Sequence, residues 1–334
     1  MEQSSSVLIM GGSGQAGAGT AALLRQWYPT LPLTLAGRDL ERARRVADEL
    51  GTADAVTIDL TRAGLGLPAD YQPTAVVAAV WDNHLHGLRY ALDHAVPYLG
   101  ISSGMVDTAP EVVAWSQRPG TAPMLIASHY LAGLVVLATM DSARAFDRVD
   151  TIRVSSVLDE KDAGGPAAQA DLQRLMATTT SGFVRRDGVF TWIDAAAAQA
   201  EVTSGDGVTL PGQSIATLDV PSIALATGAP NVRFDFANGE SAGRRRGAQG
   251  AVEVRIEMRG TDPNGNSRST TRYFTHPDGQ RPLTALGVAL GVERLLGLRG
   301  APATPGVHLP ESLLDPTHVI ARMREVGTVF TDTE

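Results

Sequence analysis

A glycine-rich stretch directly after a short apolar run constrains this chain more than any other feature. Residues 7–10 have the composition of a buried parallel strand, and residues 12–17, which fit G-x-G-x-x-G, follow them and open a helical segment. In this context the glycines allow a tight turn, close approach of the backbone to a pyrophosphate, and close helix–strand packing. The helix N-terminus adds unpaired N–H groups that favour phosphate. We therefore predict a dinucleotide-binding loop rather than a plain glycine turn.

Strand-like apolar runs alternate with helical segments through the first third of the chain. The amphipathic segment 40–50 stops at Gly51, and further strands are predicted at 33–36, 55–60, 74–80, 98–101 and 124–127. This alternation implies a parallel sheet with helices on both faces. We predict an α/β fold with a Rossmann-type, doubly wound parallel sheet over residues 1–127.

The pattern changes after about Asp150, where strand-like segments follow one another with few helices between them. Residues 252–275 alternate in polarity around an Asp-Pro-Asn-Gly turn, as in a β-hairpin. We predict a second α+β domain, built on a mixed or antiparallel sheet, over residues 128–281. Residues 282–298 return to helical periodicity and are expected to pack on the first domain, whereas the tail after Val329 is expected to fray.

Composition excludes several classes of site and partner. The formal net charge of −8 argues against nucleic acid or an anionic membrane as a partner. The absence of cysteine excludes disulfides, thiolate metal sites and cysteine nucleophiles. His84, His86 and His94 have no obvious carboxylate partner, so no metal site is predicted. The start lacks the features of a secretory signal, and no stretch approaches the ~20 apolar residues of a membrane span. We expect a soluble, cytoplasmic protein.

The end of the second predicted strand indicates which nicotinamide cofactor is bound. NAD enzymes usually place an acidic residue there to accept hydrogen bonds from the ribose 2′-hydroxyl, whereas this chain has Ala36, Gly37 and Arg38. A guanidinium can hold a 2′-phosphate bidentately and stack over adenine. Asp39 leaves NAD(H) open as an alternative, although its place directly before a helical run favours a helix cap. We predict NADP(H) as the cofactor.

Four stretches at the two ends of the chain share their order with a known family. They read GGSGQAG, AGRDLERARRVADELG, VVAAVWDNHLHGLRYALDHAVPYLGIS, and RPLTALGVALGVERLL with PGVHLPESLLDP. Together they resemble the saccharopine dehydrogenase-like (saccharopine reductase) superfamily. The resemblance implies that the chain returns at about 282–330 to complete the nucleotide domain, and that it transfers hydride at a C–N bond of an amino-acid-derived imine. Residues 150–275 match poorly, so the resemblance implies a reaction class and not a substrate.

The resemblance also implies where the nicotinamide lies. Val80 and Trp81 follow the fourth strand, where the family's backbone passes the nicotinamide, although Trp81-Asp82-Asn83-His84 departs from the family's Asn and Pro-Tyr pattern. Ser102 and Ser103 follow the fifth strand, and carboxyl ends of parallel strands are where such sheets bind ligands. The complete set of predicted cofactor-binding residues is Gly12, Ser13, Gly14, Gln15, Ala16, Gly17, Gly37, Arg38, Asp59, Val80, Trp81, Ser102 and Ser103.

Three residues are candidates for the catalytic acid, because imine reduction needs a proton donor for the nitrogen. His129 and Tyr130 follow the sixth predicted strand, and a helix cap is the alternative role for His129. Asp159 begins a charged cluster that could place an acid in the cleft or form a solvated turn. The arginines at 185–186 and 244–246 could clamp a substrate carboxylate, although surface loops are the simpler interpretation.

These observations predict an NADP(H)-dependent oxidoreductase acting on CH–NH groups, by imine reduction, reductive amination or the reverse, on a small amino-acid-like or amine substrate. An NADPH-dependent ketone or aldehyde reductase, with Tyr130 protonating oxygen, is the alternative among enzymes. A non-catalytic NADP-binding protein is the alternative of another class. A homodimer is expected if a face of the second sheet is exposed.

Overall fold

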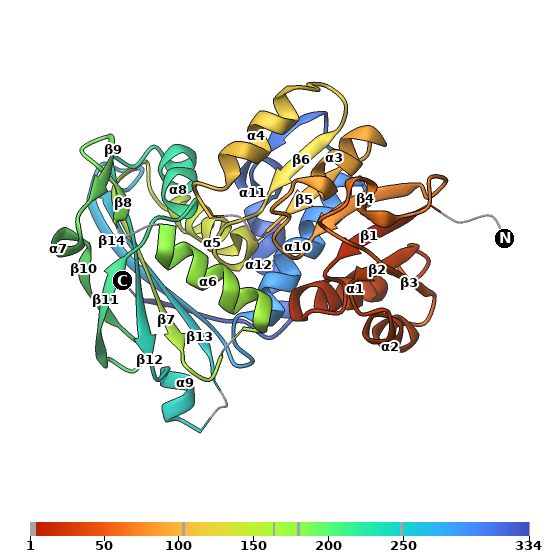
Figure 1. The fold of residues 1–334 in the computed structure, drawn as a ribbon. Helices are drawn as coiled ribbons and strands as arrows, with labels where there is room; N and C mark the ends of the chain where they lie inside the picture. The colour runs from red at the N-terminus through yellow and green to blue at the C-terminus, as the bar shows by residue number, and fades with distance from the viewer. Residues whose placement is uncertain (1–4, 102–103, 163, 179–180, 248–249, 334) are drawn as a thin grey trace. The chain divides into compact units, whose positions relative to one another are not determined.

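The chain folds into two compact units. The computed structural model describes residues 5–101, 104–162, 164–178, 181–247 and 250–333 (Figure 1). Unit 1 consists of Met1–Ser128, Gly165–Asp171 and Thr284–Leu314, and unit 2 of His129–Gly164, Leu172–Leu283 and Asp315–Glu334. No helix in these described ranges is long and apolar enough to cross a membrane.

Unit 1 is built on a parallel sheet in the order β15-β6-β5-β4-β1-β2-β3. The strands are β1 (Ser6–Met10), β2 (Leu33–Gly37), β3 (Ala53–Thr57), β4 (Pro73–Ala78), β5 (Tyr98–Gly100), β6 (Pro123–Ile126) and β15 (Gly306–His308). The order of the first six strands is that of the Rossmann fold, so the predicted fold class is confirmed. Every residue of β1 is buried, which agrees with the apolar run at residues 7–10.

The helices of unit 1 come from both ends of the chain. They are α1 (Gln15–Trp27), α2 (Leu40–Leu50), the 3₁₀ turn η1 (Ala63–Gly66), α3 (His86–Asp93), α4 (Thr108–Ser116), most of α10 (Arg281–Leu295) and α11 (Pro310–Leu313). Helix α10 packs so closely that a Cβ on Gly291 would lie 2.6 Å from Leu99 and 2.8 Å from Leu125. The Tyr28 hydroxyl also donates to Glu293 of α10 at 2.5 Å. Helix α10 is therefore packed on the sheet and on the helical layer of unit 1.

Unit 2 is built on a mixed sheet, as predicted. Its main path is β10-β11-β12-β7-β13-β14-β16, in which β12 and β7 are parallel and the other pairs antiparallel. The strands are β7 (Arg148–Asp159), β8 (Gly182–Arg186), β9 (Val189–Ile193), β10 (Gln199–Thr203), β11 (Thr209–Ser214), β12 (Asn231–Gly239), β13 (Val252–Thr261), β14 (Ser267–His276) and β16 (Val329–Thr333). The predicted hairpin is β13–β14, whose turn is closed by N–H groups of Asn264 and Asn266 donating to the Asp262 carboxylate.

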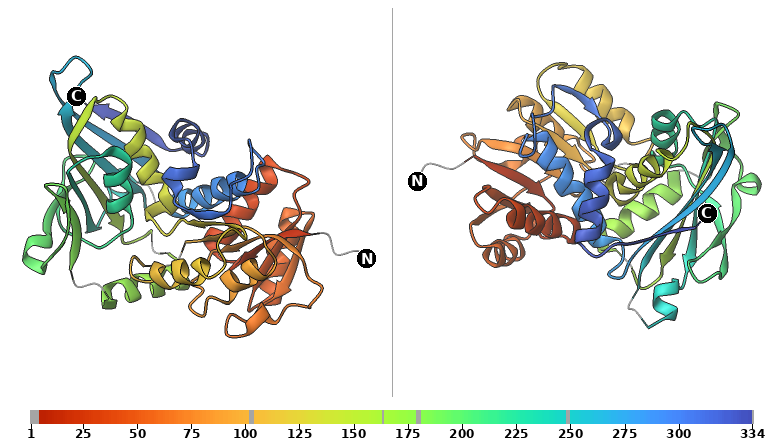
Figure 2. Two further views of the ribbon diagram at one scale, coloured as in Figure 1. Left: turned by 90° about the horizontal axis from the view of Figure 1, so that it is seen from above. Right: turned by 180° about the vertical axis from the view of Figure 1, so that it is seen from behind.

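The helical elements of unit 2 are η2 (Tyr130–Gly133), α5 (Leu134–Ala143), α6 (Pro166–Thr178), α7 (Ala195–Ala198), α8 (Asp219–Thr227), α9 (Ala242–Arg245) and α12 (Pro316–Glu325). Helix α5 contacts β13 and α8 contacts β12, and the two helices pack on each other beside the sheet (Figure 2). The first residues of α6, up to Asp171, group with unit 1. There the Gln15 side-chain oxygen accepts a hydrogen bond from the Gly165 N–H at 3.0 Å.

The C-terminal segment passes from unit 1 to unit 2 earlier than its sequence suggests. The return to unit 1 ends at Leu314 and not at about 330. Helix α12 packs instead on α5, and β16 pairs antiparallel with β14 from Val329 opposite Thr275 onward. The expectation of a frayed tail after Val329 is therefore wrong, because those residues form an edge strand of the second sheet.

Gly17 is a position in unit 1 where a side chain would strike backbone. A Cβ there would lie 2.4 Å from the Gly11 carbonyl oxygen and 2.9 Å from the Gly12 Cα. Backbone cannot yield cheaply, so we expect Gly17→Ala to lower the free energy of unfolding by about 1–3 kcal/mol. Urea titration followed by circular dichroism measures this.

The control for Gly17→Ala is Gly37→Ala in the same unit. A Cβ on Gly37 would meet only the Ser13 hydroxyl, at 3.8 Å, which is ordinary contact. We expect its effect to stay within about 0.5 kcal/mol. Equal losses in the two variants would contradict the close approach of α1 to the preceding loop.

Candidate functional site

The glycine loop after β1 is held by its own backbone. The N–H groups of Gly11 and Gly12 both donate to the Ala36 carbonyl, at 2.8 and 3.1 Å, and the Gly14 N–H donates to Gly11 at 2.8 Å. Gly11 has a φ of +75°, and a Cβ on Gly12 would lie 2.8 Å from the Ile9 carbonyl oxygen. The loop therefore makes the tight turn and the close packing that the motif predicts.

The start of α1 has the features of a phosphate-binding helix end. Gly14 precedes the helix with extended backbone angles, and the first turn holds no acidic residue. A Cβ on Gly14 would meet only the Gly11 oxygen, at 3.1 Å, so the loop is open on its other sides. The first N–H groups of a helix lack intrahelical acceptors and carry partial positive charge. These residues fit the pyrophosphate of a dinucleotide.

Arg38 and Asp39 take different roles at the end of β2. The Asp39 carboxylate accepts a hydrogen bond from the Arg42 N–H at 3.0 Å and so caps α2, as predicted. Arg38 is exposed, and within the described part of the chain its guanidinium makes no hydrogen bond, ion pair or ring contact. The Asp39 carboxylate is thus used in capping α2, while the neighbouring Arg38 guanidinium is available to a ligand.

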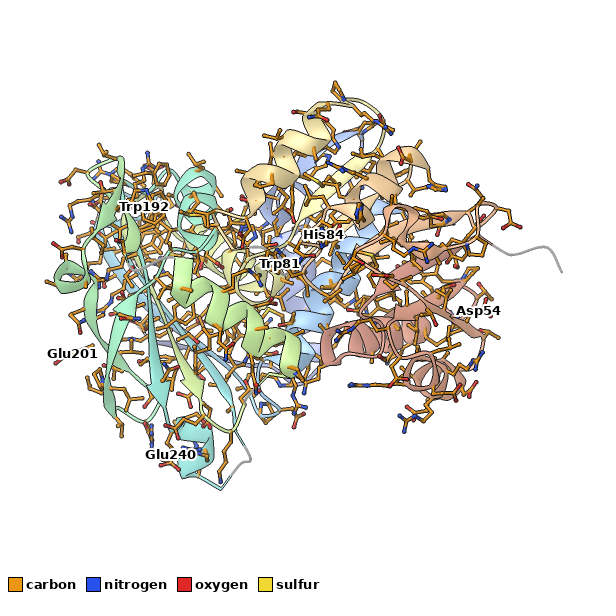
Figure 3. The ribbon with its side chains drawn as sticks, in the orientation of Figure 1. Asp54, Trp81, His84, Trp192, Glu201 and Glu240 are labelled. Carbon is orange, nitrogen blue, oxygen red and sulfur yellow. The ribbon has the colours of Figure 1, made fainter. Side chains whose placement is uncertain are left out.

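Asp59 and Val80 follow two strands of the same sheet, the edge strand β3 and the more central β4, which are separated by β1 and β2. The Asp59 carboxylate accepts from the N–H and hydroxyl of Thr61, at 2.9 and 2.7 Å, and these bonds lower the pKa of Asp59. Its geometry is that of a local turn, which leaves a cofactor role as a prediction. Val80 lies against the glycine loop, since its Cβ would be 3.2 Å from a Cβ on Gly11. Trp81 follows it (Figure 3), whereas Ser102 and Ser103 lie outside the described residues.

Asp82 is a buried carboxyl that sequence reasoning treated only as a departure from a family pattern. Its side chain is 3% exposed and accepts a hydrogen bond from the Leu88 N–H at 2.9 Å, at the start of α3. Burial raises the pKa of Asp82, against the opposing effect of these backbone hydrogen bonds. In the sequence, this role of Asp82 is indicated only by its position four residues before His86, where α3 begins. We assign Asp82 to holding α3 in place.

His129 is buried in unit 2 and does not fit the role of proton donor. Its Nε2 lies 2.8 Å from the Ser222 hydroxyl of α8, and its Nδ1 has no hydrogen-bond partner among the described residues. Burial lowers the pKa of His129 to about 3, so the ring is neutral near pH 7. Its side chain makes no cap to η2 either.

Tyr130 lies in the same loop as His129, and its hydroxyl stays protonated near neutral pH. Its N–H donates to the Asp219 carboxylate at 3.0 Å, and its hydroxyl oxygen lies 3.2 Å from the Ser156 hydroxyl oxygen. Burial raises the pKa of Tyr130 far above neutrality. The next two residues, Leu131 and Ala132, are buried with φ values of +52°. Such strained backbone persists only where surrounding contacts hold it, and it clusters at functional sites.

The charged cluster at the end of β7 is partly buried. The Asp159 carboxylate accepts from the N–H groups of Lys161 and Ser241, both at 2.8 Å, and pairs with Arg244 at 3.2 Å. Burial alone would raise the pKa of Asp159, but the bonds from Ser241 and Lys161 and the charge of Arg244 lower it. Asp159 is therefore an ionised structural anchor and not a proton donor at neutral pH.

Asp162, three residues further on, has the opposite character. It is buried and accepts a hydrogen bond from the Gln280 N–H at 2.7 Å. Burial raises the pKa of Asp162 to about 6, despite that hydrogen bond and the charge of Arg281. It is thus the carboxyl of this cluster that exchanges its proton closest to neutral pH. The sequence does not distinguish it from its exposed neighbours, Glu160 and Lys161.

The arginine runs are more structural than their sequence suggests. Arg245 pairs with Asp206 at 2.6 Å, and Arg185 donates to the carbonyls of Ala224 and Ala229 at 3.0 and 3.2 Å. These contacts correct the expectation of plain surface loops, because most guanidiniums of the runs tie strands to loops. No cluster of three or more metal-ligating side chains occurs in the ranges that the structure describes.

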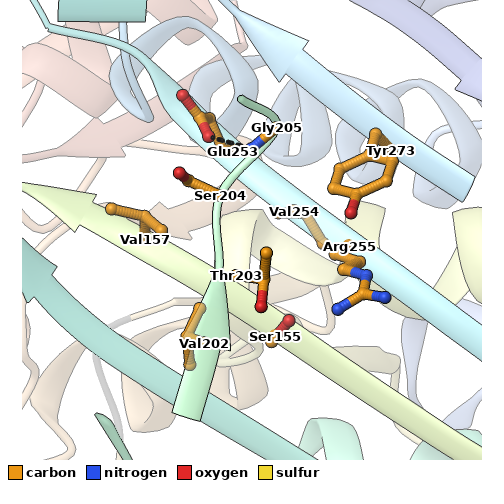
Figure 4. Close-up of a pocket in the computed structure, with 10 residues that line it drawn as sticks. All are labelled: Ser155, Val157, Val202, Thr203, Ser204, Gly205, Glu253, Val254, Arg255 and Tyr273. Atoms are coloured by element: carbon orange, nitrogen blue, oxygen red, sulfur yellow. Dashed lines mark hydrogen bonds between the residues drawn. The ribbon is translucent and has the colours of Figure 1, made fainter. Parts of the chain in front are cut away.

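The face of the second sheet carries a shallow depression that lacks a free acid. Glu253, Arg255 and Tyr273 lie along it (Figure 4). The Glu253 carboxylate accepts from the Gly205 N–H at 3.1 Å and, with its other oxygen, from the Gly243 N–H at 3.0 Å. Both oxygens are thus used in holding loops, and we do not assign an active site to this depression.

Comparison with known proteins identifies the fold. No family model and no curated protein sequence matches the chain. Among solved structures, saccharopine dehydrogenase (L-Glu forming) from Saccharomyces cerevisiae aligns over 99% of this chain and 100% of its own, with a TM-score of 0.67 and 12% identity. This chain has the saccharopine dehydrogenase-like fold. A probable dehydrogenase from Thermotoga maritima aligns over 97% and 98% at a TM-score of 0.49 and 10% identity. Dihydrodipicolinate reductase from Paenisporosarcina sp. TG-14 aligns over 92% and 98% at 0.46 and 12%.

Burial of His129 makes the folded chain sensitive to acid. Its pKa is about 3 when folded and 6.5 when free, so the folded state binds the proton less tightly. The stability that the neutral ring contributes is complete above pH 6.5 and is lost as the pH falls, by roughly 2 kcal/mol at pH 5. His129→Gln is expected to remove this loss, measured as the free energy of unfolding between pH 7 and 5. An unchanged pH profile would contradict the buried, neutral ring.

Asp162 has the opposite dependence. Its folded pKa of about 6 lies above the ordinary 3.8, so the folded state binds the proton more tightly and gains stability as the pH falls from about 7 to 4. We expect Asp162→Asn to abolish that gain and to stabilise the chain at pH 7 by about 1–2 kcal/mol, less than the full shift because water reaches part of the group. Glu160→Gln, at a carboxylate whose side chain is 70% exposed, is the control and should leave the profile unchanged.

Proposed function

We propose that this chain is an NADP(H)-dependent oxidoreductase that acts at a C–N bond of a small amino-acid-like or amine substrate. The observation that carries the proposal is the glycine loop of unit 1 together with the available guanidinium at the end of β2. The loop is tied to β2 through the Ala36 carbonyl, which lies two residues before Arg38. The phosphate-binding helix end and the cation are thus held by one short piece of backbone.

The choice of NADP(H) rests on charge at the ribose end of the site. A 2′-phosphate needs a cation, and a carboxylate in its place would repel it. Arg38 has no other partner in the described chain, and the Asp39 carboxylate is used by α2. Gly37 adds room beside them, because a Cβ there would meet only Ser13 at 3.8 Å. These features favour the phosphorylated cofactor.

The bound nicotinamide would supply or accept the hydride, and the chain's own residues would orient the substrate and hold the proton. Tyr130 is the candidate proton donor of the loop after β6, where its backbone N–H is held by Asp219 and its hydroxyl by Ser156. Chemistry at a C–N bond is favoured by the shared fold with saccharopine dehydrogenase, which spans the whole chain. A fold alone supports many reactions, so the substrate class rests on assay.

A ketone or aldehyde reductase with the same cofactor is the competing activity. The Tyr130 hydroxyl supports it equally, because a tyrosine can deliver a proton to the oxygen of a carbonyl as well as to the nitrogen of an imine when hydride adds to the carbon. NADPH consumption with a keto acid plus an amine, compared with the keto acid alone, separates the two. Binding of NADPH with no turnover on either set would favour a non-catalytic role.

Arg38→Ala is the direct test of the cofactor assignment. Loss of a bidentate contact to phosphate should weaken NADPH binding about 10- to 100-fold, while NADH binding changes less than about 3-fold. Titration calorimetry with each cofactor measures both constants.

Arg45→Ala is the matched control, because it removes the same charge from an exposed position further along α2. We expect it to change the affinity for either cofactor by less than about 2-fold at 0.15 M salt, since screening weakens contacts beyond about 8 Å. If Arg38→Ala weakened the binding of NADPH and NADH equally, that result would contradict the NADP(H) assignment.

A further inference from the structure

Strand β9 is an exposed, uncharged edge of the second sheet. It reads Val-Phe-Thr-Trp-Ile and pairs, within the described chain, with β8 alone. Val189 is 63% exposed and Trp192 50%, and Trp192 lies at the surface of its unit (Figure 3). Natural edge strands are usually protected by charges, proline or bulges, because an open apolar edge is a template for another strand. None of these protections occurs between Val189 and Ile193.

The hairpin geometry shows which backbone groups face the open edge. Asp187 and Gly188 both have positive φ values, +48° and +83°, as in a two-residue type I′ turn. The pair that closes such a turn exchanges hydrogen bonds, and bonded pairs then alternate along an antiparallel ladder. The N–H and C=O groups of Phe190 and Trp192 therefore point away from β8. The pairing of Arg185, opposite Phe190, with Val232 of β12 on its other side agrees with this alternation.

An aromatic row crosses this hairpin on one face. The rings of Phe183 and Trp192 are 4.8 Å apart, those of Phe183 and Phe190 are 5.7 Å apart, and the Arg185 guanidinium lies 5.4 Å from the Phe190 ring. Aromatic pairs across strands are favourable units of sheet stabilisation. The row ends at β9 because no further strand of the chain, as far as it is described, continues it.

We propose that two copies of this chain associate by antiparallel pairing of their β9 strands, with Thr191 opposite the partner's Thr191. In this register Phe190 lies opposite the partner's Trp192, and both residues present the backbone groups that face the open edge. Each aromatic row then continues across four strands, from Arg185 through Phe190 to the partner's Trp192 and the partner's Phe183. The two-fold symmetry makes the second row identical to the first.

The charge of β9 and the area that its side chains can bury both agree with a second copy of this chain as the partner. The strand between Val189 and Ile193 is uncharged, so no like charges face each other along the paired strands. Phe190 is 36% exposed and Trp192 50%. Since a covered aromatic side chain buries about 150–250 Å², these residues supply less than the ~800 Å² per partner of a standard interface. We therefore expect a concentration-dependent dimer with a dissociation constant in the micromolar range.

A cysteine cross-link tests the register. The chain contains no cysteine, so each introduced thiol is unique. Thr191 meets the partner's Thr191 in a non-hydrogen-bonded pair, where Cα atoms lie about 4.5 Å apart and a disulfide can form. Thr191→Cys should give a covalent dimer under mild oxidation. Val189→Cys is the matched control in the same strand, because its two copies would lie about 14 Å apart and should stay unlinked. Cross-linking of both or of neither overturns the register.

Sedimentation of the full chain tests the interface itself. We expect wild type to shift from monomer to dimer between about 1 and 100 μM. Trp192→Glu should remain monomeric and folded, with a melting temperature lowered only by the loss of its packing on Phe183. Val113→Glu, at a 58% exposed valine on α4, makes the same apolar-to-acidic change elsewhere and should leave the dimer intact. Wild type that stays monomeric at 100 μM, or a dimer that survives Trp192→Glu, overturns the proposal.

Discussion

The close approach of α1 to the loop after β1 is the constraint on which the nucleotide unit depends. The backbone of Gly17 passes where a Cβ would strike the Gly11 carbonyl oxygen, and Gly12 passes β2 in the same way. Because the loop also donates twice to Ala36, the contact fixes α1 to both β1 and β2. The end of β2 is therefore positioned by the same bonds that aim the helix at a ligand. Preorganisation of this kind lowers the entropy cost of binding.

The second unit uses polar side chains mainly to hold loops in place. Asp159 and Glu253 each accept backbone N–H groups from two separate segments, which joins the ends of strands to α9 and its surroundings. Satisfying buried carboxylates in this way offsets the cost of removing them from water. Two proton-bearing groups remain beside these anchors, the Asp162 carboxyl and the Tyr130 hydroxyl in the loop after β6. In that loop the neutral His129 and Tyr130 directly precede Leu131 and Ala132, whose backbone is strained.

The sequence predicts those features that local pattern encodes. The strands of the first sheet, the glycine loop, the cap at Asp39 and the β13–β14 hairpin each depend on residues close together in the chain. The passage of the chain from unit 1 to unit 2 after Leu314 depends instead on a partner strand more than fifty residues away, since β16 pairs with β14. Likewise, burial makes His129 neutral and Asp162 protonated near pH 6, and burial is set by tertiary neighbours. No spacing in the sequence encodes either.

Unit 1 is assembled from three separated stretches, and this has a consequence for biosynthesis. Leu99 and Leu125 are covered by α10, and β6 gains its outer neighbour only when β15 has been made. A ribosome that has finished β6 must still add about 170 residues before α10 is complete, which takes roughly 10–30 s at ordinary rates of synthesis. During that interval the nascent first unit exposes an apolar sheet face and an open edge. Its folding in the cell is thus tied to the completion of the second unit, and chaperones that shield apolar surfaces have a defined time in which to act.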